Sequence, residues 1–499
     1  MGSPEDHKER QEKQQEMVQP LIHRNEAAMT GEGSGPTLEF VDGIELFPPS
    51  RWKVTGTLRL AFDRDNTEGG TNRLILVDTT VVPNGSDPKI IDAMYAYDVI
   101  GVHVDIATHG PDADLGLQAF RNTGSNPDIF KAIYDDKDSV FVSEKDDIPV
   151  NATATATLKV FCYPKGPEGG LCGSSPPDTM GPNPNYDPKK STGPRAAHHR
   201  SFVVKALPDF KPLIELVQSI RNLAGLTNQK DKKHLVIVNP KAGLGKAPKV
   251  LIDYIVPMLE EEAGMNLQVI ETKHANHAAE LIKSNQINPA DFDAVIGLGG
   301  DGIMSEVFQG INARDDRDAI LKNLTIGMVG CGTGNGLACS VAAESNEKMR
   351  ILESVFLIAK GDTKHMDVSK YSARSESYLS FLTFSWGLIA DVDIESDAIR
   401  FMGSIRYELW AAMRIFTKRQ YRARFSYLPP GLVNDIHSYD MPTLDQPVPD
   451  NWTTIEDDFI LFWASHVSHA SRTTHNSPNS TLDDGVFRIF ILRYVLTCS

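Results

Sequence analysis

The chain of 499 residues contains little cysteine, no excess of positive charge and no long apolar run. Its five cysteines are scattered and odd in number, which argues against a disulfide framework and for a reducing compartment. The net charge of −16 argues against nucleic acid as a partner, because phosphate contacts need a basic surface. No apolar stretch reaches the length of a membrane span, and the charged first residues do not have the pattern of a signal peptide. We therefore expect a cytoplasmic protein.

The first 225 residues predict a tail and a β-rich domain. Residues 1–48 are polar and contain clustered glycine, as in a disordered tail. Residues 49–225 combine a Pro- and Gly-rich loop at 163–200, a closing helix from Pro208 to near Gly225, and β-rich runs at 55–62, 73–77, 153–160 and 201–204. This outline is typical of a pleckstrin-homology-like domain, and equally of any small β domain with a closing helix.

A different pattern covers residues 232–365. Four expected strands, at 234–238, 267–271, 294–298 and 325–329, alternate with expected helices near 247–262, 275–285, 303–312 and 336–343. This order predicts an α/β, Rossmann-like domain with a parallel sheet and helices on both faces. Ligands of such sheets bind beyond the carboxyl ends of the strands, where the glycine-rich segments of this chain lie.

Residues 366–499 are β-rich again. Expected strands lie at 378–385, 422–428, 459–465 and 487–492, and one expected helix interrupts them at about 396–416. His466 and His469 fit neither a metal pair nor a nearby nucleophile, so we interpret them as structural.

Two glycine-rich turns carry the strongest chemical signal. Gly299-Gly300-Asp301-Gly302 follows the third strand, and a run of alternating glycines from Gly330 to Gly336 follows the fourth. Backbone N–H groups and helix N-termini at such turns hold phosphate oxygens. A carboxylate does not help to hold phosphate, so Asp301 is either a ligand for a metal that bridges phosphates or a base for an attacking hydroxyl. The pattern indicates phosphoryl transfer.

Two more familiar nucleotide motifs fit less well. The turn from Asn239 to Lys246 is basic and contains glycine, but Pro240 and Ala247 occupy positions where a P-loop needs glycine and a hydroxyl. It still suits phosphate, with a tight turn carrying solvated lysines as the alternative. Residues 297–302 match G-x-G-x-x-G, but they follow the third strand and would place Asp301 against a pyrophosphate, which argues against a dehydrogenase.

Arg400 and Arg406 lie six residues apart in the helix expected at 396–416. Their axial separation of about 9 Å would let both long side chains reach one polyphosphate. Ordinary ion pairs on a solvated helix are the alternative.

Taken together, these segments resemble the lipid kinases of the diacylglycerol kinase catalytic superfamily, and most closely the sphingosine kinases. The resemblance runs from about Lys232 to the end of the chain. Its most specific part is Phe384-Ser385-Trp386-Gly387-Leu388-Ile389-Ala390-Asp391-Val392-Asp393-Ile394-Glu395-Ser396, supported by the turn at 272–278. It implies ATP and Mg²⁺ as cofactors, a nucleotide in a cleft between the α/β domain and a β-sandwich, and a lipid pocket in that β-sandwich.

The resemblance also implies roles for individual residues. Asp301 would accept the proton of a primary hydroxyl, and Asp393 would pair with the amine of a sphingoid base. The lipid head group would contact Gly299, Gly300, Asp301, Gly302 and Asp393. The nucleotide would contact Asn239, Pro240, Lys241, Thr272, Lys273, His274, Ala275, Asn276, Glu306, Gly332, Thr333, Gly334, Arg400 and Arg406. The metal ligands stay unassigned.

The chain departs from the family pattern near its end. A late Asp-Gly-Glu of the family is absent, because Asp483-Asp484-Gly485 matches an earlier turn. We therefore expect a β-sandwich that is incomplete, with 487–496 as an apolar strand without its partners.

The resulting hypothesis is a kinase that phosphorylates the primary hydroxyl of a sphingoid base during transient contact with a membrane, as a peripheral protein. A homodimer is compatible with the sequence. The alternatives are a ceramide or diacylglycerol kinase, or a truncated and catalytically weak product that binds lipid or regulates a partner.

Overall fold

The structure, a computed structural model, describes residues 38–40, 46–47, 58–63, 73–78, 89–109, 153–166, 191–204, 211–226 and 232–494, the last without 333, 374–375, 403–404, 418, 433–438 and 440. The chain divides into two compact units. The first comprises Met1–Lys232, Ile255–Asn266 and Val355–Gly361, and the second comprises Lys233–Tyr254, Leu267–Ser354 and Asp362–Ser499. Most of the expected tail at 1–48 and the middle of the expected loop at 163–200 lie outside the described residues.

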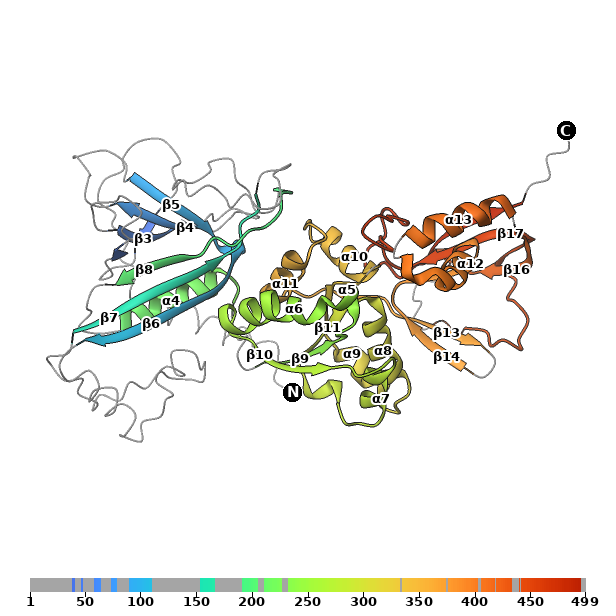
Figure 1. The fold of residues 1–499 in the computed structure, drawn as a ribbon, viewed down its shortest axis with the longest axis horizontal. Helices are drawn as coiled ribbons and strands as arrows, with labels where there is room; N and C mark the ends of the chain where they lie inside the picture. Colours follow the sequence, from blue (N-terminus) through green and yellow to red (C-terminus); the bar gives the residue numbers. More distant parts are fainter. Residues whose placement is uncertain are drawn as a thin grey trace. The chain divides into compact units, whose positions relative to one another are not determined.

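An antiparallel sheet forms the basis of the first unit (Figure 1). Its strands follow the order β5-β4-β3-β2-β8-β7-β6, with β1 beside β3. Their bounds are β1 (Leu38–Phe40), β2 (Leu46–Phe47), β3 (Leu58–Asp63), β4 (Arg73–Asp78), β5 (Lys89–Tyr95), β6 (Val99–His109), β7 (Thr153–Cys162) and β8 (Arg200–Val204). The 3₁₀ helix η3 (Ala96–Asp98) joins β5 to β6.

Helix α4 (Lys211–Leu223) buries the apolar stripe that its sequence predicts. Leu213, Leu216, Val217 and Ile220 recur at helical spacing and share one core with sheet residues such as Phe202. The β-rich run and its closing helix are therefore confirmed. The assignment of this part as a pleckstrin-homology-like domain stays a prediction.

The second unit is built on a four-stranded sheet of the predicted kind. Strands β9 (Lys233–Val238), β10 (Asn266–Glu271), β11 (Ala294–Gly299) and β12 (Ile326–Gly330) follow the order β10-β9-β11-β12, and β11 is parallel to both β9 and β12. Apolar, buried residues make up most of β9 and β11, as expected for strands covered on both faces. All four predicted strands are confirmed. The order reverses between β9 and β11, the point at which open α/β sheets bind ligands.

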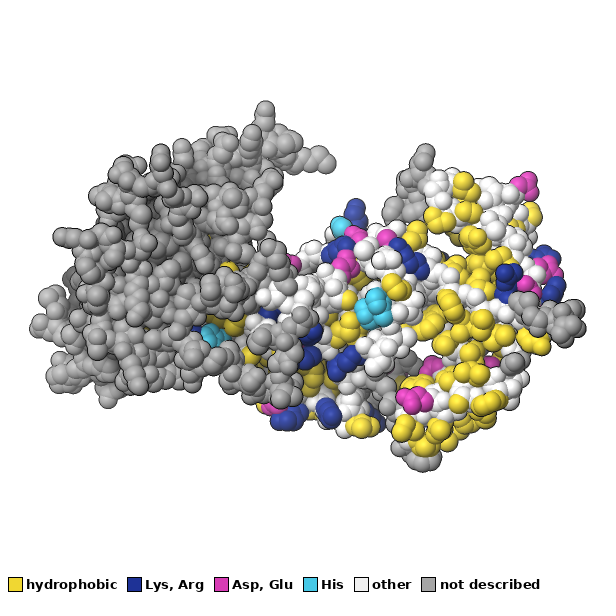
Figure 2. Space-filling view, turned by 90° about the horizontal axis from the view of Figure 1, so that it is seen from above, with side chains coloured by type: hydrophobic (Ala, Val, Ile, Leu, Met, Phe, Trp, Pro, Cys, Tyr) yellow, Lys and Arg dark blue, Asp and Glu magenta, His cyan; other side chains and the backbone are white. Residues whose placement is uncertain are grey.

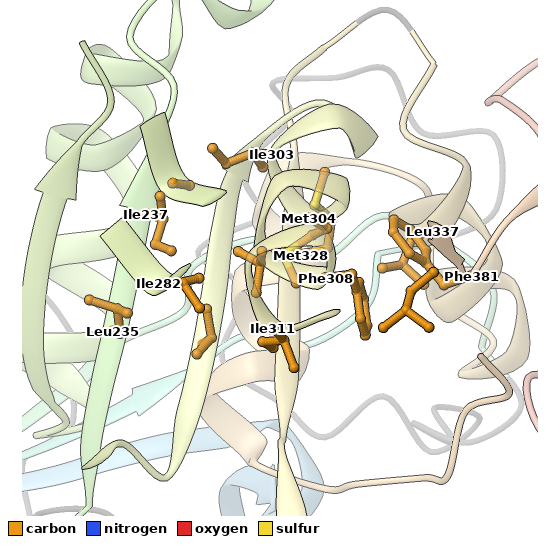
Figure 3. Packing of buried hydrophobic residues seen from close by; sticks show 14 of the residues in the cluster. Leu235, Ile237, Ile282, Ile303, Met304, Phe308, Ile311, Met328, Leu337 and Phe381 are labelled. Atoms are coloured by element: carbon orange, nitrogen blue, oxygen red, sulfur yellow. The ribbon is translucent and has the colours of Figure 1, made fainter. Parts of the chain in front are cut away.

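Helices connect or follow these strands in the chain. Their bounds are α5 (Ala242–Gly245), α6 (Ala247–Val250), the π-helix η4 (Leu251–Glu262), α7 (His277–Lys283), the 3₁₀ helix η5 (Pro289–Asp291), α8 (Asp301–Asn312), α9 (Arg317–Asn323), α10 (Gly336–Glu344) and α11 (Ile351–Lys360). Figure 3 shows how Met304 and Phe308 of α8 pack among buried residues of the sheet and of α7 and α10. Pro257 lies inside η4 and cannot donate an intrahelical hydrogen bond, which accounts for the irregular winding of the helix predicted at 247–262.

The remainder of the second unit is mainly antiparallel β structure. The long strand β17 (Thr453–Ser465) pairs with β15 (Thr383–Gly387), β16 (Tyr421–Tyr427) and β18 (Arg488–Arg493), while β13 (Ser369–Ala373) and β14 (Glu376–Ser380) form a separate ribbon. Helices α12 (Leu388–Glu395), η6 (Ser396–Met402) and α13 (Ile405–Thr417) lie between β15 and β16 in the chain. The assignment of this part as a lipid-binding β-sandwich stays a prediction.

Two expected elements are each divided in the structure. The strand expected at 378–385 becomes β14 and β15, because Phe381 turns into the α/β core and its ring lies 5.0 Å from that of Phe308. The helix expected at 396–416 becomes η6 and α13, so Arg400 and Arg406 do not share one helix. Ile399 has a non-helical backbone, and Gly403, a poor helix former, stands between the two elements in the sequence.

The strand β18 is paired, contrary to the expectation for 487–496. Six of its residues pair with β17, including Phe490 opposite Trp463. The partner of β18 is β17, a strand that lies earlier in the sequence. The side chain of Phe490 remains 59% exposed.

Candidate active site

Three glycine-containing turns meet at the carboxyl edge of the parallel sheet. The Cys331 N–H donates to Gly299 O (2.8 Å), and the Asn239 N–H donates to Leu298 O (3.0 Å). A Cβ on Gly332 would lie 2.7 Å from the Gly300 Cα, and a Cβ on Gly243 would lie 2.2 Å from Cys331 O. Backbones approach so closely here that only glycine fits. The turns after β9, β11 and β12 therefore form one continuous backbone surface.

Asn335 fixes the shape of the third turn. Its side chain accepts a hydrogen bond from the Gly332 N–H (2.8 Å) and donates one to Gly332 O (2.7 Å). The residue has a left-handed backbone (φ 59°), which asparagine adopts more easily than most residues. The sequence interpretation did not single out Asn335, although an asparagine in a glycine-rich turn is a signal for this conformation.

Asp301 lies at the amino ends of two helices. It is the first residue of α8, and its carboxylate accepts hydrogen bonds from the N–H groups of Gly336 (2.8 Å) and Leu337 (3.1 Å) at the start of α10. Burial raises the pKa of Asp301, while these backbone donors act in the opposite direction. A partly desolvated carboxylate at this edge has the properties of a proton acceptor.

The turn after β10 is attached to both neighbouring elements. The backbone N–H of Thr272 donates to Val238 O of β9 (2.8 Å), and the Thr272 hydroxyl donates to the same oxygen (3.3 Å). Glu306 of α8 accepts a hydrogen bond from the Ala278 N–H (3.1 Å) at the start of α7. Glu306 thus anchors the helix that follows the turn. The intervening residues are exposed: Lys273, His274, Ala275 and Asn276.

The basic turn after β9 presents its charges to solvent. Asn239 accepts a hydrogen bond from the Lys241 N–H (3.1 Å), while Pro240 is half-buried and Lys241 is exposed. Gly243 and Leu244 both have a left-handed backbone, which gives the turn its sharp bend. The structure therefore brings together the predicted residues of the first three strand ends, together with Gly332 and Gly334. Thr333 lies outside the described residues.

The two predicted phosphate-binding arginines are not brought together on one helix. Arg406 of α13 is buried, pairs with Asp397, and donates to the Tyr407 hydroxyl (2.6 Å). These partners match the ion-pair alternative for Arg406. The side chain of Arg400 lies outside the described part of the structure. Binding of nucleotide by either residue stays a prediction.

Of the three acidic residues on α12, two are held by partners. The Tyr421 hydroxyl lies 2.6 Å and 2.7 Å from the carboxylate oxygens of Asp391. Glu395 accepts from Arg414 (2.7 Å) and Trp410 (2.9 Å), and these donors lower the pKa of Glu395 to about 2. Asp393 is exposed, and its side chain has no partner among the residues that the structure describes. The sequence interpretation missed the network around Asp391 and Glu395, since its partners come from α13 and β16.

Within the described ranges, no three His, Cys, Asp or Glu side chains gather as they would around a metal ion. None of the helices in the described part of the chain is both long and apolar enough to cross a membrane.

The chain is similar to known proteins over the region that contains these turns. The family described as the diacylglycerol kinase catalytic domain matches residues 233–371. A solved structure described as a diacylglycerol kinase from Bacillus anthracis str. Sterne is 20% identical, with a TM-score of 0.37, and the match covers 52% of this chain and 74% of that one.

Curated relatives share more of the sequence. Sphingosine kinase 1 of Arabidopsis thaliana is 31% identical over 279 residues, which cover 52% of this chain and 57% of that protein. Sphingosine kinase 1 of Homo sapiens is 31% identical over 280 residues, which cover 52% of this chain and 71% of that protein. The chain thus spans just over half the length of the plant relative and more than two thirds of the human one. It belongs to the sphingosine kinase family.

Proposed function

We propose that this protein transfers the γ-phosphate of ATP to the primary hydroxyl of sphingosine or a related sphingoid base. The observation that carries the proposal is the position of Asp301, a partly desolvated carboxylate at the meeting point of the glycine-containing turns. Family membership supports the same reaction class.

The proposed step needs few groups from the protein. The lipid oxygen attacks the γ-phosphorus, the bond from that phosphorus to the bridging oxygen of ADP breaks, and Asp301 takes the hydroxyl proton. The backbone surface around Gly299, Gly300 and Gly332 is suited to hold phosphate oxygens. Glycine has no side chain that would keep a phosphate away from the backbone N–H groups. Positioning of the reactants, together with electrostatic stabilisation of the transferred group, accounts for most of the catalysis in such reactions.

Magnesium fits this arrangement without a dedicated cage of carboxylates. Mg²⁺ keeps several waters and would be held largely by the substrate phosphates, which leaves the carboxylate of Asp301 to act as the base. When bound, the ion would neutralise charge on the phosphates.

Asp393 is the proposed partner of the substrate amine. It is an acid of α12 whose carboxylate faces solvent, whereas Asp391 and Glu395 already bind hydroxyl, indole and guanidinium donors. A protonated amine would give Asp393 a charge-assisted hydrogen bond that a neutral diacylglycerol cannot offer.

Contact with a membrane is proposed through α13, whose polarity is inverted. Its packed face carries Arg406, Trp410 and Arg414, whereas its exposed face carries Ile405, Leu409, Met413 and Phe416. Figure 2 shows hydrophobic side chains gathered on the C-terminal part of the second unit. An exposed apolar helix face of this kind can bind to the surface of a lipid bilayer. A peripheral cytoplasmic enzyme would encounter its lipid substrate at that surface.

Transfer of radiolabel from ATP tests the proposal with sphingosine, ceramide and diacylglycerol side by side. We expect labelled product with sphingosine, and a loss of roughly 10²–10⁴-fold in Asp301→Asn, as is typical when a general base is removed. Asp393→Asn should raise the KM for sphingosine far more than that for ATP. Absence of transfer to every lipid, or near-normal turnover by Asp301→Asn, would contradict the proposal.

A further inference from the structure

The loop between β17 and β18 packs against the start of α10, next to Asp301. The His469 N–H donates to the Ser340 hydroxyl (3.1 Å), which in turn donates to Gly336 O (2.8 Å). A Cβ on Gly336 would lie 2.9 Å from His469 O and 3.0 Å from Ala470 O. The loop backbone therefore lies directly on the turn of α10 whose N–H groups bind Asp301.

The tip of this loop is a tight turn that carries Arg472. The Ala470 N–H donates to Thr474 O (2.9 Å), the Thr474 N–H donates to Ser471 O (3.2 Å), and the rings of His469 and His475 stack 4.1 Å apart. Ser471 forms an isolated β-bridge with Asn335, the residue that fixes the third glycine turn. Arg472 is the next residue, and its Cα lies about 3.8 Å from that of Ser471. The backbone of Arg472 is therefore close to the third glycine turn.

Arg472 and Asp301 lie near the same groups. A Cβ on Gly334 would lie 3.3 Å from Asp301 Oδ2 and 3.8 Å from Ala470 O, so the carboxylate and the loop flank one glycine. Burial raises the pKa of the Cys339 thiol to about 11, while Arg472 acts to lower this pKa and Asp301 acts to raise it. Both charged groups therefore lie within electrostatic reach of one side chain on α10.

The guanidinium of Arg472 is available to a ligand. Its side chain is exposed, and no ion pair or hydrogen bond joins it to another described residue. Arg406 differs in this respect, because Asp397 and Tyr407 already occupy its guanidinium. An unpaired guanidinium beside a glycine turn is suited to bidentate contact with a phosphate.

We propose that Arg472 binds the γ-phosphate of the nucleotide and stabilises the negative charge that this group carries during transfer. This role rests on the proposed kinase function and adds a residue from the β17–β18 loop to its active site. Charge on a transferring phosphoryl group spreads over its outer oxygens, and an arginine supplied by a neighbouring segment is an effective counter-charge. Asp301 would receive the hydroxyl proton while Arg472 holds the group that moves.

Nucleotide binding separates this role from a structural one. Arg472→Ala should lower the affinity for a non-hydrolysable ATP analogue about tenfold or more and change the affinity for ADP by less than about twofold, because ADP lacks the contacted group. Arg472→Lys should recover part of the affinity, because lysine keeps the positive charge but cannot make the bidentate contact of a planar guanidinium. Arg317→Ala, which removes an arginine on α9 that pairs with Asp318, is the matched control and should change neither affinity.

Transfer assays supply the second readout. Arg472→Ala should reduce kcat by about 10²-fold or more, with the thermal midpoint unchanged. Equal losses of ADP and ATP-analogue binding, or no loss of either, would overturn the role of Arg472. If the unaltered protein binds the ATP analogue but phosphorylates no lipid, the proposed function fails while the ADP comparison still decides the role of Arg472. If it binds neither nucleotide, both proposals fail.

Discussion

Asp301 combines burial with two hydrogen-bond donors, and these have opposite effects on its charge. Burial, the larger effect, raises its pKa, and the N–H groups of Gly336 and Leu337 partly compensate. As a base, Asp301 must be ionised, so activity should fall as the pH drops through this raised pKa. We expect the acid limb of the kcat profile above the ordinary aspartate value of about 3.9. Initial rates from pH 4.5 to 8 measure it, with fluorescence as a control for unfolding. A flat profile down to the pH of unfolding would contradict the assigned role.

Asn335 can be tested by separating its backbone conformation from its hydrogen bonds. Asn335→Gly keeps access to the left-handed backbone but loses both bonds to Gly332, at a cost of about 1 kcal/mol for each. Asn335→Ala loses the same bonds and adds about 1 kcal/mol or more of backbone strain. We therefore expect unfolding midpoints in the order wild type, Gly, Ala, with turnover reduced in both variants. Equal midpoints for Gly and Ala would show that the backbone conformation is not strained.

Glu262 makes the stability of the first unit depend on pH. Its carboxyl group accepts a hydrogen bond from the Tyr163 hydroxyl (2.7 Å) and lies 3.6 Å from His199, and burial raises its pKa to about 7. Because the fold favours the protonated form, this contribution is complete below the ordinary pKa of 4.5 and is lost as the pH rises to about 7. The loss amounts to about 3 kcal/mol at most. His199, whose pKa burial lowers, has an opposing effect at acid pH.

Urea unfolding of Glu262→Gln tests this dependence. The amide cannot ionise, so the variant should be more stable than wild type at pH 8 and less sensitive to pH between 5 and 8. His199→Gln, made in both backgrounds, removes the opposing histidine. The His199→Gln variant that keeps Glu262 should have a urea midpoint that falls between pH 5 and 8. A constant midpoint would show that ionisation of Glu262 does not destabilise the fold.

At the scale of elements, α13 shows how polar contacts can hold a helix whose apolar face is exposed. Arg414 and Trp410 bind Glu395 of α12, while Leu409 and Phe416 lie on the exposed face of α13. Leu409→Glu and Phe416→Glu should each reduce binding to lipid vesicles several-fold, with little change in the unfolding midpoint, because neither side chain leaves a core. Ile252→Glu, at a similarly exposed apolar position on η4, is the control. Equal loss of vesicle binding in the control would exclude a specific role for α13.

The sequence predicts elements well where local pattern and tertiary environment agree. The strands β9, β11 and β12 are short apolar runs bounded by turn residues, so their existence and order follow from composition. The division of 378–385 does not follow, because it depends on Phe381 finding Phe308 in a core about 70 residues earlier in the chain. The pairing of β18 with β17 is likewise a long-range choice that strand propensity does not specify.

The features of the candidate site also divide into those that the sequence predicts and those that it does not. Glycines that permit close backbone approach, and the carboxylate of Asp301 beside them, are visible in the sequence because each lies at a strand end. The contacts of Glu306 with Ala278 and of Ser340 with His469 are not, since each joins a side chain to a backbone group of a segment distant in the sequence. Such contacts become evident only when the turns are placed side by side.

At the scale of the whole molecule, the first compact unit is not confined to the N-terminal residues. It also takes in Ile255–Asn266 and Val355–Gly361, two segments that come from the α/β region of the sequence. Lys360 is buried and its ammonium donates to the carbonyls of Val99 (3.2 Å) and Ala224 (2.5 Å). The guanidinium carbon of Arg195 lies 3.6 Å from the ring centre of Phe356, which is fully buried. The N-terminal sheet thus provides the environment for the end of α11.

Removal of residues 1–231 should therefore destabilise what remains. The shortened chain would expose Val355, Phe356 and Ala359, each 0% exposed at present, and would leave Lys360 without the carbonyls that it binds. Exposure of a buried Phe or Val side chain costs about 1.5–3 kcal/mol each. We expect broad or early elution in size-exclusion chromatography and a lowered unfolding midpoint. Polar substitutions at Val355 and Phe356 should restore a single peak in the shortened chain and destabilise the 499-residue chain. A shortened chain that elutes as one species with an unchanged midpoint would show that α11 and η4 are stable without the N-terminal sheet.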